Sequence, residues 1–186
     1  GSLDLLEAMF YFVVSRSSPP AFNDCPFFIG KKHRCIETIT ETPREEVVKF
    51  QEQERERFNN PTQPYVYQFR GQKRIVSPAK RTIRGKQAVK ARDHFLLVSE
   101  RPPHVNLLCL IRDAAARLPG GIGTRADVSL LLKDSQFVVE VSDGSRSQVV
   151  SSALDRLHSE NDPCVKYDSE QKLWIYLHRR KREEDF

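Results

Sequence analysis

The chain has 186 residues, with 30 Lys or Arg, 25 Asp or Glu and a hydrophobic fraction of 39%. This length is enough for one or two domains with a buried core. The apolar run Leu3–Val14 is interrupted by Asp4 and Glu7 and is shorter than the about 20 residues of a membrane span, so no membrane partner is expected.

The net charge of +5 is concentrated in one stretch of the chain. Residues 69–100 carry 9 Lys or Arg against 2 Asp or Glu, whereas residues 101–178 carry 9 against 10. Any electrostatic attraction to nucleic acid is therefore expected from the first of these stretches.

Residues 1–61 are expected to form an N-terminal helical and irregular segment, which begins with a buried helix at Leu3–Val14. The nearest candidates for metal ligands are Cys25, His33 and Cys35. Their spacing fits no common zinc pattern and a fourth ligand is missing nearby, so no metal site is predicted. The four cysteines show no paired spacing, which favours a reducing compartment, the cytosol or the nucleus.

A better-defined helix is predicted from Thr42 to about Phe58. Thr42 suits the cap, Pro43 suits the first helical position, and Glu45 completes a capping box. The interior, Gln51–Arg57, has almost no apolar stripe. This pattern favours a solvated helix that is held by its ends.

Residues 62–103 are predicted to form a hairpin and a basic linker. Tyr65–Phe69 and Arg74–Val76 have strand composition with a turn at Gly71–Gln72 between them, and a helix is expected near Gln87–Val98. The candidates for non-specific nucleic-acid contact are Arg70, Lys73, Arg74, Lys80, Arg81, Arg84 and Lys86, followed by Lys90 and Arg92. Such a run could instead pack on an acidic protein face or be a solvated linker.

Beyond Pro102–Pro103, residues 104–178 show the strongest patterns in the chain. Apolar residues at helical spacing predict one helix at Asn106–Leu118 and two more that open with capping boxes at Thr124 and Ser145.

After Pro163 the apolar period changes to two, which predicts a hairpin that returns through Leu173–Leu177. Three helices followed by a hairpin are the element order of a winged helix. The fold class is therefore α+β: a C-terminal winged-helix-like domain preceded by a mixed α/β extension, with residues 179–186 as a charged tail. Trp174 is expected to be buried against the helices. Trp174 and Ile175 point to opposite faces and both are apolar, so the alternative is an exposed Trp174 that contacts a partner.

No constellation of catalytic residues emerges from the sequence. Gly120–Gly123 lacks the Lys-Ser/Thr of a phosphate-binding loop and is interpreted as a turn. His158 ends a predicted helix and His178 a predicted strand, and neither has a clear catalytic partner. We therefore expect no enzymatic activity, no cofactor and no small-molecule substrate.

The third helix and the wing carry too little positive charge for a DNA-reading winged helix, which places Lys, Arg, Asn or Gln on the exposed recognition face. The predicted wing carries two acidic residues, Asp168 and Glu170, and one basic residue, Lys172. Protein binding is the favoured role, and its candidate residues are Arg146, Gln148, Ser151, Ser152, Asp155, Arg156, Glu170 and Lys172. A DNA-binding winged helix remains the alternative.

Several runs of sequence carry a family signature: Arg112–Pro119, Gly123–Asp127, Leu131–Phe137, Ala153–His158, Asp162–Asp168 and Lys172–His178. Two upstream runs, Phe50–Arg55 and Lys90–His94, extend it. Together they resemble the winged-helix-like domain of the nuclear factor related to kappa-B-binding protein family over roughly residues 45–186. The chain departs from the expected pattern at the Gly120–Gly123 turn and the Val138–Arg146 loop.

This resemblance implies a nuclear subunit of an INO-type ATP-dependent chromatin-remodelling complex, with roles in transcription regulation, DNA repair and DNA recombination. It also implies that the winged domain is a protein-interaction module whose partners are other subunits of that complex. Non-specific DNA contact through residues 70–92 is kept as a second expectation.

Overall fold

The structure is a computed structural model that describes residues 39–80 and 90–186. Thr40–Phe186 form one compact unit. No helix within the described ranges combines the length and the apolar character needed to cross a bilayer. The predicted helix Leu3–Val14 and the metal candidates Cys25, His33 and Cys35 lie outside these residues.

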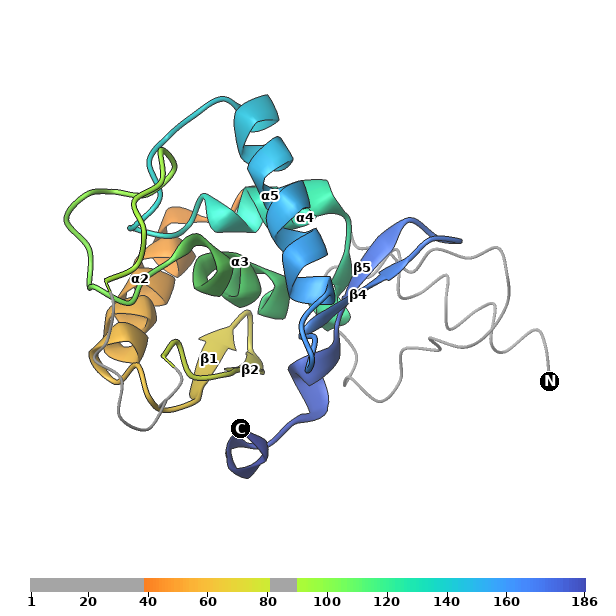
Figure 1. Ribbon diagram of the computed structural model, residues 1–186, viewed down its shortest axis with the longest axis horizontal. Helices are drawn as coiled ribbons and strands as arrows, with labels where there is room; N and C mark the ends of the chain where they lie inside the picture. Colours follow the sequence, from red (N-terminus) through yellow and green to blue (C-terminus); the bar gives the residue numbers. More distant parts are fainter. Residues whose placement is uncertain (1–38, 81–89) are drawn as a thin grey trace. The chain divides into compact units, whose positions relative to one another are not determined.

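Three helices form the centre of the unit (Figure 1): α3 (Leu107–Ala116), α4 (Arg125–Leu132) and α5 (Asp143–His158), and they pack against one another through their apolar faces. The order of three helices was predicted correctly. Each helix begins at a side-chain oxygen that accepts a backbone N–H, and these capping residues are Asn106, Thr124 and Ser142. The predicted cap at Ser145 is wrong, because α5 begins earlier, after Ser142.

The predicted wing hairpin is confirmed as β4 (Val165–Asp168) and β5 (Leu173–Tyr176), which pair antiparallel. A third strand, β3 (Ile122–Gly123), pairs with β5 on its other edge, so the order is β3-β5-β4. The glycine-rich run Gly120–Gly123, which was interpreted as a turn, therefore has two parts. Gly120 and Gly121 have positive φ and turn the chain in η2 (Pro119–Gly121), and the next two residues form the strand β3. Helices α3, α4 and α5 with this sheet make the winged helix.

The prediction that Trp174 is buried is confirmed, since only 6% of it is exposed. Its ring packs against those of Tyr167 and His158, at centroid distances of 5.0 and 6.2 Å. All residues of the central strand β5 are buried, so both faces of this strand belong to the core. The chain then ends in two short 3₁₀ helices, η3 (Leu177–Arg180) and η4 (Glu183–Asp185).

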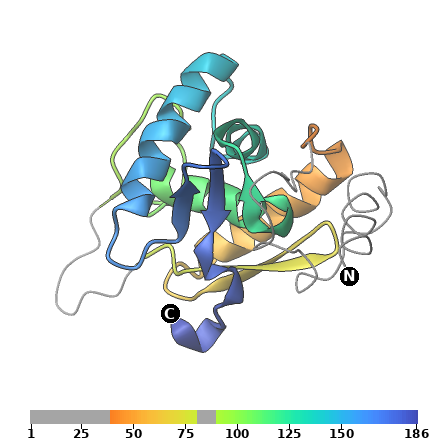
Figure 2. The same cartoon turned by 90° about the vertical axis from the view of Figure 1, so that its right-hand side faces the viewer.

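On the other side of α3 lie α2 (Arg44–Asn59) and the predicted hairpin, formed by β1 (Tyr65–Phe69) and β2 (Gln72–Val76). Figure 2 shows α5 and the wing on one side of the fold and α2 with this hairpin on the other. The sequence pattern changes at Pro102–Pro103, but the packing does not, because β2 contacts α3 within the same compact unit.

The expected solvated helix at residues 42–58 is not what forms. Phe50, Glu54, Arg57 and Phe58 of α2 are buried, so the helix carries a stripe that is half charged. The capping box is also absent: Pro43 is the cap and makes no side-chain hydrogen bond. The two phenylalanines and the two charged residues between them fix α2 against the rest of the unit.

The helix expected near Gln87–Val98 is also wrong for residues 90–98, which form no helix. Leu97 forms an isolated antiparallel bridge with Val138, and the Val139 N–H donates to the Leu96 carbonyl at 2.8 Å. This segment instead runs beside the loop between α4 and α5.

Candidate protein-interaction surface

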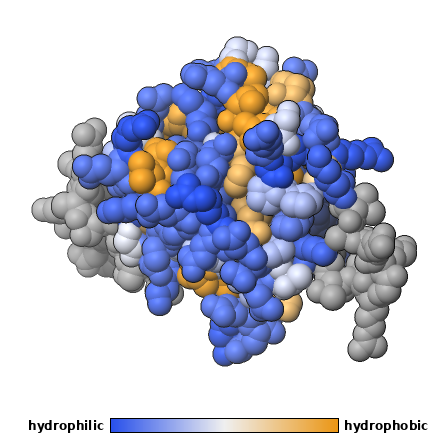
Figure 3. All heavy atoms as spheres, turned by 90° about the vertical axis from the view of Figure 1, so that its left-hand side faces the viewer, coloured by the Kyte–Doolittle hydropathy of each residue, from blue (hydrophilic) through white to orange (hydrophobic). Residues whose placement is uncertain are grey.

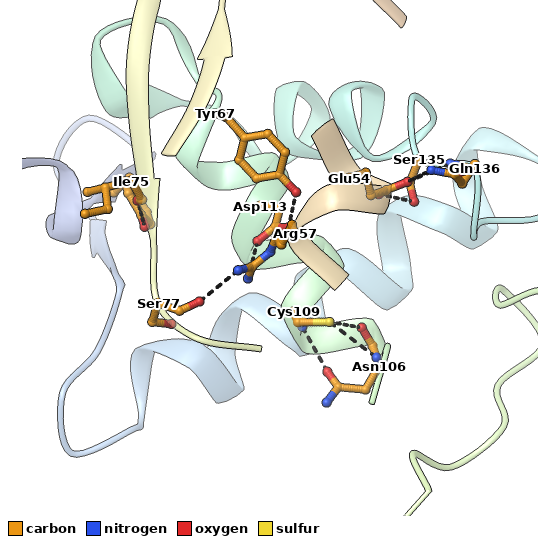
Figure 4. A network of polar contacts seen from close by, with 11 residues as sticks. Glu54, Arg57, Tyr67, Ile75, Ser77, Asn106, Cys109, Asp113, Ser135 and Gln136 are labelled. Carbon is orange, nitrogen blue, oxygen red and sulfur yellow. Dashed lines mark hydrogen bonds and ion pairs between the residues drawn. The ribbon is translucent and has the colours of Figure 1, made fainter. Parts of the chain in front are cut away.

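The face of α3 toward α2 holds a buried ion pair (Figure 4). Arg57 Nε and Nη2 donate to the two carboxylate oxygens of Asp113 at 2.7 and 2.9 Å, and each residue is 1% exposed. The Tyr67 hydroxyl donates to the same carboxylate at 2.7 Å, and Arg57 Nη1 donates to the Ser77 carbonyl at 3.0 Å. Burial is the largest single cause and acts to lower the Arg57 pKa, but the charges of Asp113, Tyr67 and Cys109 and the hydrogen bond to Asp113 together raise it. Sealed from solvent, this cluster joins α2, β1 and α3.

A second buried group, Glu54, ties α2 to the end of α4. Its carboxylate accepts hydrogen bonds from the Ser135 hydroxyl at 2.6 Å and from the Gln136 backbone and side-chain amides at 3.1 Å (Figure 4). Burial raises the pKa of Glu54 to about 7, although these donors act in the opposite direction. The contact is structural, because the side chain is 0% exposed.

A third tie uses Arg117, at the end of α3. Its Nη1 donates to Asp134 at 3.1 Å and its Nη2 donates to the Leu131 carbonyl at 2.8 Å, while the guanidinium lies 3.6 Å from the Phe50 ring centroid. The Thr42 hydroxyl also donates to Asp134, at 2.7 Å. The predicted cap residue therefore holds the start of α2 through a tertiary contact instead.

The two cysteines among the described residues, Cys109 and Cys164, are also buried within the fold. Cys109 is buried and free, and its thiol donates to the Asn106 carbonyl at 3.0 Å within the cap of α3. Burial raises the pKa of Cys109 to about 12 and raises that of Cys164 as well, so both thiols stay protonated at neutral pH. Within residues 39–80 and 90–186, no three His, Cys, Asp or Glu side chains gather as metal ligands.

The outward face of α5 carries most of the predicted interaction residues. Gln148, Ser152, Asp155 and Arg156 are exposed, and Ser151 is half-exposed. This face of the helix therefore presents small polar groups with one acidic and one basic residue, a nearly neutral surface.

Arg146, also predicted on this face, points inward. It is 3% exposed, its Nε donates to the Ser129 carbonyl at 3.0 Å, and its Nη2 pairs with Asp143. The guanidinium thus fixes the start of α5 to α4. Arg146 precedes the buried Val150 by four residues, so helical spacing places it on the inner face. Its charge had suggested an exposed position.

The wing presents the two other predicted residues, Glu170 and Lys172, both exposed at its tip. Asp168 Oδ1 accepts the N–H groups of Glu170 and Gln171 at 3.0 and 3.1 Å, which closes the loop, and Lys172 takes a positive φ of 57°. The exposed wing tip is therefore held in a defined conformation.

Sequence reasoning missed a groove beside α5. It has a volume of about 740 Å³ and lies between the outer face of α5, the first turn of α3 and residues 91–97. Its apolar lining includes Leu97, Leu107, Leu108, Val149 and Ala153, and its polar lining includes Arg92, Asp93, Gln148, Ser152 and Arg156. We call it the α5 groove. Apolar patches interrupt the hydrophilic surface on the side of the molecule that carries residues 90–105 (Figure 3).

Among the described residues, the basic side chains predicted to contact nucleic acid differ in their exposure. Arg70 pairs with Glu46 at 3.3 Å, Lys73 is exposed, Arg74 is 7% exposed, and Lys80 is half-buried. Burial lowers the pKa of Arg74 to about 10, with a further contribution from Arg179. Arg81, Arg84 and Lys86 lie outside the described residues.

Comparison with known proteins shows the family. Residues 46–184 match the model of the NFRKB second winged helix domain, which covers α2, both hairpins and the three central helices. The chain belongs to the NFRKB family. The match extends from α2 into η4 and includes the α2 side of the fold as well as the winged helix, in agreement with the single compact unit.

A relative from Xenopus tropicalis, the nuclear factor related to kappa-B-binding protein, is 48% identical over 166 residues. The alignment covers 82% of this chain and 13% of that protein, so the chain spans a small part of its relative's length. No solved structure matches the chain.

Proposed function

We propose that this chain is a non-catalytic interaction domain of a nuclear, INO-type ATP-dependent chromatin-remodelling complex, and that it docks partner subunits through the exposed face of α5 and the wing. Membership of the NFRKB family supports the nuclear and chromatin context. The buried positions of Glu54, Asp113 and Cys109 support a role without chemistry, because these side chains are at most 2% exposed and are hydrogen-bonded within the chain.

The inward position of Arg146 is the observation that carries the proposal. A winged helix that reads DNA needs cations along its recognition helix to replace counterions on phosphates. With Arg146 holding α4, the outer face of α5 has Arg156 as its basic side chain, and Asp155 lies beside it. The wing balances Lys172 against Glu170 in the same way. Such a surface favours a protein partner.

The test is recovery of partner subunits from nuclear extract by the tagged chain. Asp155→Lys and Gln148→Lys introduce positive charge on the exposed face and should reduce recovery of subunits several-fold while the circular dichroism spectrum is unchanged. Glu52→Lys, at an exposed position of α2 on the opposite side, is the matched control and should recover subunits like the unaltered chain. Full recovery by both α5 variants would refute docking through this face.

DNA binding through residues 70–92 is the second candidate, favoured by the excess of Lys and Arg in residues 69–100. A mobility shift at two salt concentrations, with and without residues 69–92, separates the candidates. A steep salt dependence that disappears on deletion assigns DNA contact to the basic stretch. Sequence-selective binding by residues 101–178 alone would overturn the ranking.

A further inference from the structure

We infer that the α5 groove is a docking site for an amphipathic helix of a partner protein, one that carries apolar side chains on the inner face and acidic residues at its edges. This inference rests on the proposed interaction role and names the surface and the chemistry of the partner segment.

The shape of the groove supports a helical occupant. Its lining residues on α5 run from Ser145 through Gln148 and Ser152 to Arg156, a distance of roughly 16 Å or about three helical turns. Residues four apart form a ridge on a helix surface, and a second helix packs its own side chains beside such a ridge. The small Ser145 and Ser152 side chains allow a close approach along this line.

The floor of the groove supports apolar side chains on the inner face of the occupant. Leu107 and Leu108 of α3 are only half-buried although they belong to an otherwise buried apolar helix, and Val149 of α5 is half-buried as well. At the rim, Phe95 is 63% exposed and stacks on His94 with ring centroids 4.6 Å apart. A partner that covered these side chains would remove apolar surface from water, and exposed aromatic residues beside a groove are typical interaction hot spots.

The charge of the lining supports acidic flanks. Arg92 and Arg156 both line the groove and are exposed, and among the described residues neither has an ion-pair partner. The one carboxylate in the lining, Asp93, is paired with Arg101 at 3.0 Å. The groove therefore offers two cations that are not engaged in ion pairs around an apolar floor, which complements a segment with Asp or Glu beside its apolar stripe.

Selection from a displayed library of random peptides of about 16 residues on the purified chain tests the inference without any partner subunit. We expect the enriched peptides to have apolar residues at helical spacing and a net negative charge. An Arg92→Glu/Arg156→Glu double variant should bind an enriched peptide at least about tenfold more weakly. Ser152→Trp, which fills the groove from an exposed position, should do the same.

The matched control, Arg44→Glu/Arg180→Glu, makes the same change in net charge at exposed positions outside the groove and should bind like the unaltered chain. If the groove double variant loses its circular dichroism spectrum, Arg92→Gln/Arg156→Gln takes its place. The inference is overturned by an absence of enriched peptides, by enrichment without acidic bias, by undiminished binding to the groove variants, or by displacement of the peptide by duplex DNA. Subunit recovery can fail independently of these peptide results, so the two proposals are refuted separately.

Discussion

The two faces of α3 use charge in opposite ways. Toward α2, Asp113 and Arg117 are buried in ion pairs that hold the unit together. Toward α5, Leu107 and Leu108 are left half-exposed in a groove whose cations have no acidic partner. Charged groups that are buried in pairs fix a structure, whereas exposed cations beside apolar surface can attract a partner. The α2 face is thus expected to determine stability and the α5 face recognition.

Arg57→Ala should have the largest effect on stability. The substitution leaves the Asp113 carboxylate buried with Tyr67 as its remaining described hydrogen-bond donor. Removal of one partner of a buried pair costs about 3–5 kcal/mol, because the other charge stays desolvated. Urea unfolding measures the loss. Arg55→Ala, at an exposed position two residues earlier, is the control and should cost less than about 1 kcal/mol. Equal losses of unfolding free energy for Arg57→Ala and Arg55→Ala would contradict the expectation that the buried α2 face determines stability.

Trp174→Ala tests whether the wing strand also belongs to the stable part of the molecule. Loss of a buried tryptophan creates a cavity and costs about 3 kcal/mol, at the lower end for this residue type because Tyr167, which is 40% exposed, can move inward. Thermal unfolding should show the loss, while Tyr167→Ala should cost about 1 kcal/mol. A tolerated Trp174→Ala would mean that β5 contributes little to the stability of the unit.

The sequence predicted the elements well where apolar periodicity decides the structure, whereas of the three predicted capping boxes Thr124 alone was correct. The three central helices and both hairpins follow this periodicity, and Trp174 is buried as predicted. β3 was not predicted, because a strand of only two residues, Ile122–Gly123, is too short to show an alternating apolar pattern.

Two of the errors, in α2 and at Arg146, share one cause, the burial of charged residues. In α2 the buried positions Phe50, Glu54, Arg57 and Phe58 follow helical spacing, but two of the four are charged, so a hydropathy pattern shows no stripe. Arg146 on α5 was misplaced for the same reason. The α5 groove was missed because residues 91–97 form its wall without regular structure, and only tertiary contacts place them there.

The smallest expected effect concerns Glu54 and the pH dependence of the free energy of unfolding. Its pKa is about 7 in the folded chain, above the ordinary value of 4.5, because burial disfavours the charged carboxylate. Between these values the unfolded chain has released the proton and the folded chain retains it. Stability from this group is therefore complete below about pH 4.5 and decreases as pH rises to about 7.

Glu54→Gln should remove that decrease. The amide oxygen can accept from Gln136 and the amide nitrogen can donate to the Ser135 hydroxyl, so the contacts of the neutral side chain are kept. We expect the variant to be about 1–2 kcal/mol more stable than the unaltered chain at pH 8 and close to it at pH 4.5, as measured by urea unfolding across this range. Glu52→Gln, exposed on the same helix, should leave the profile unchanged. A parallel profile for Glu54→Gln and the unaltered chain would mean that the carboxylate is already ionised, stabilised by its three donors, and that the α2 face tolerates a buried negative charge.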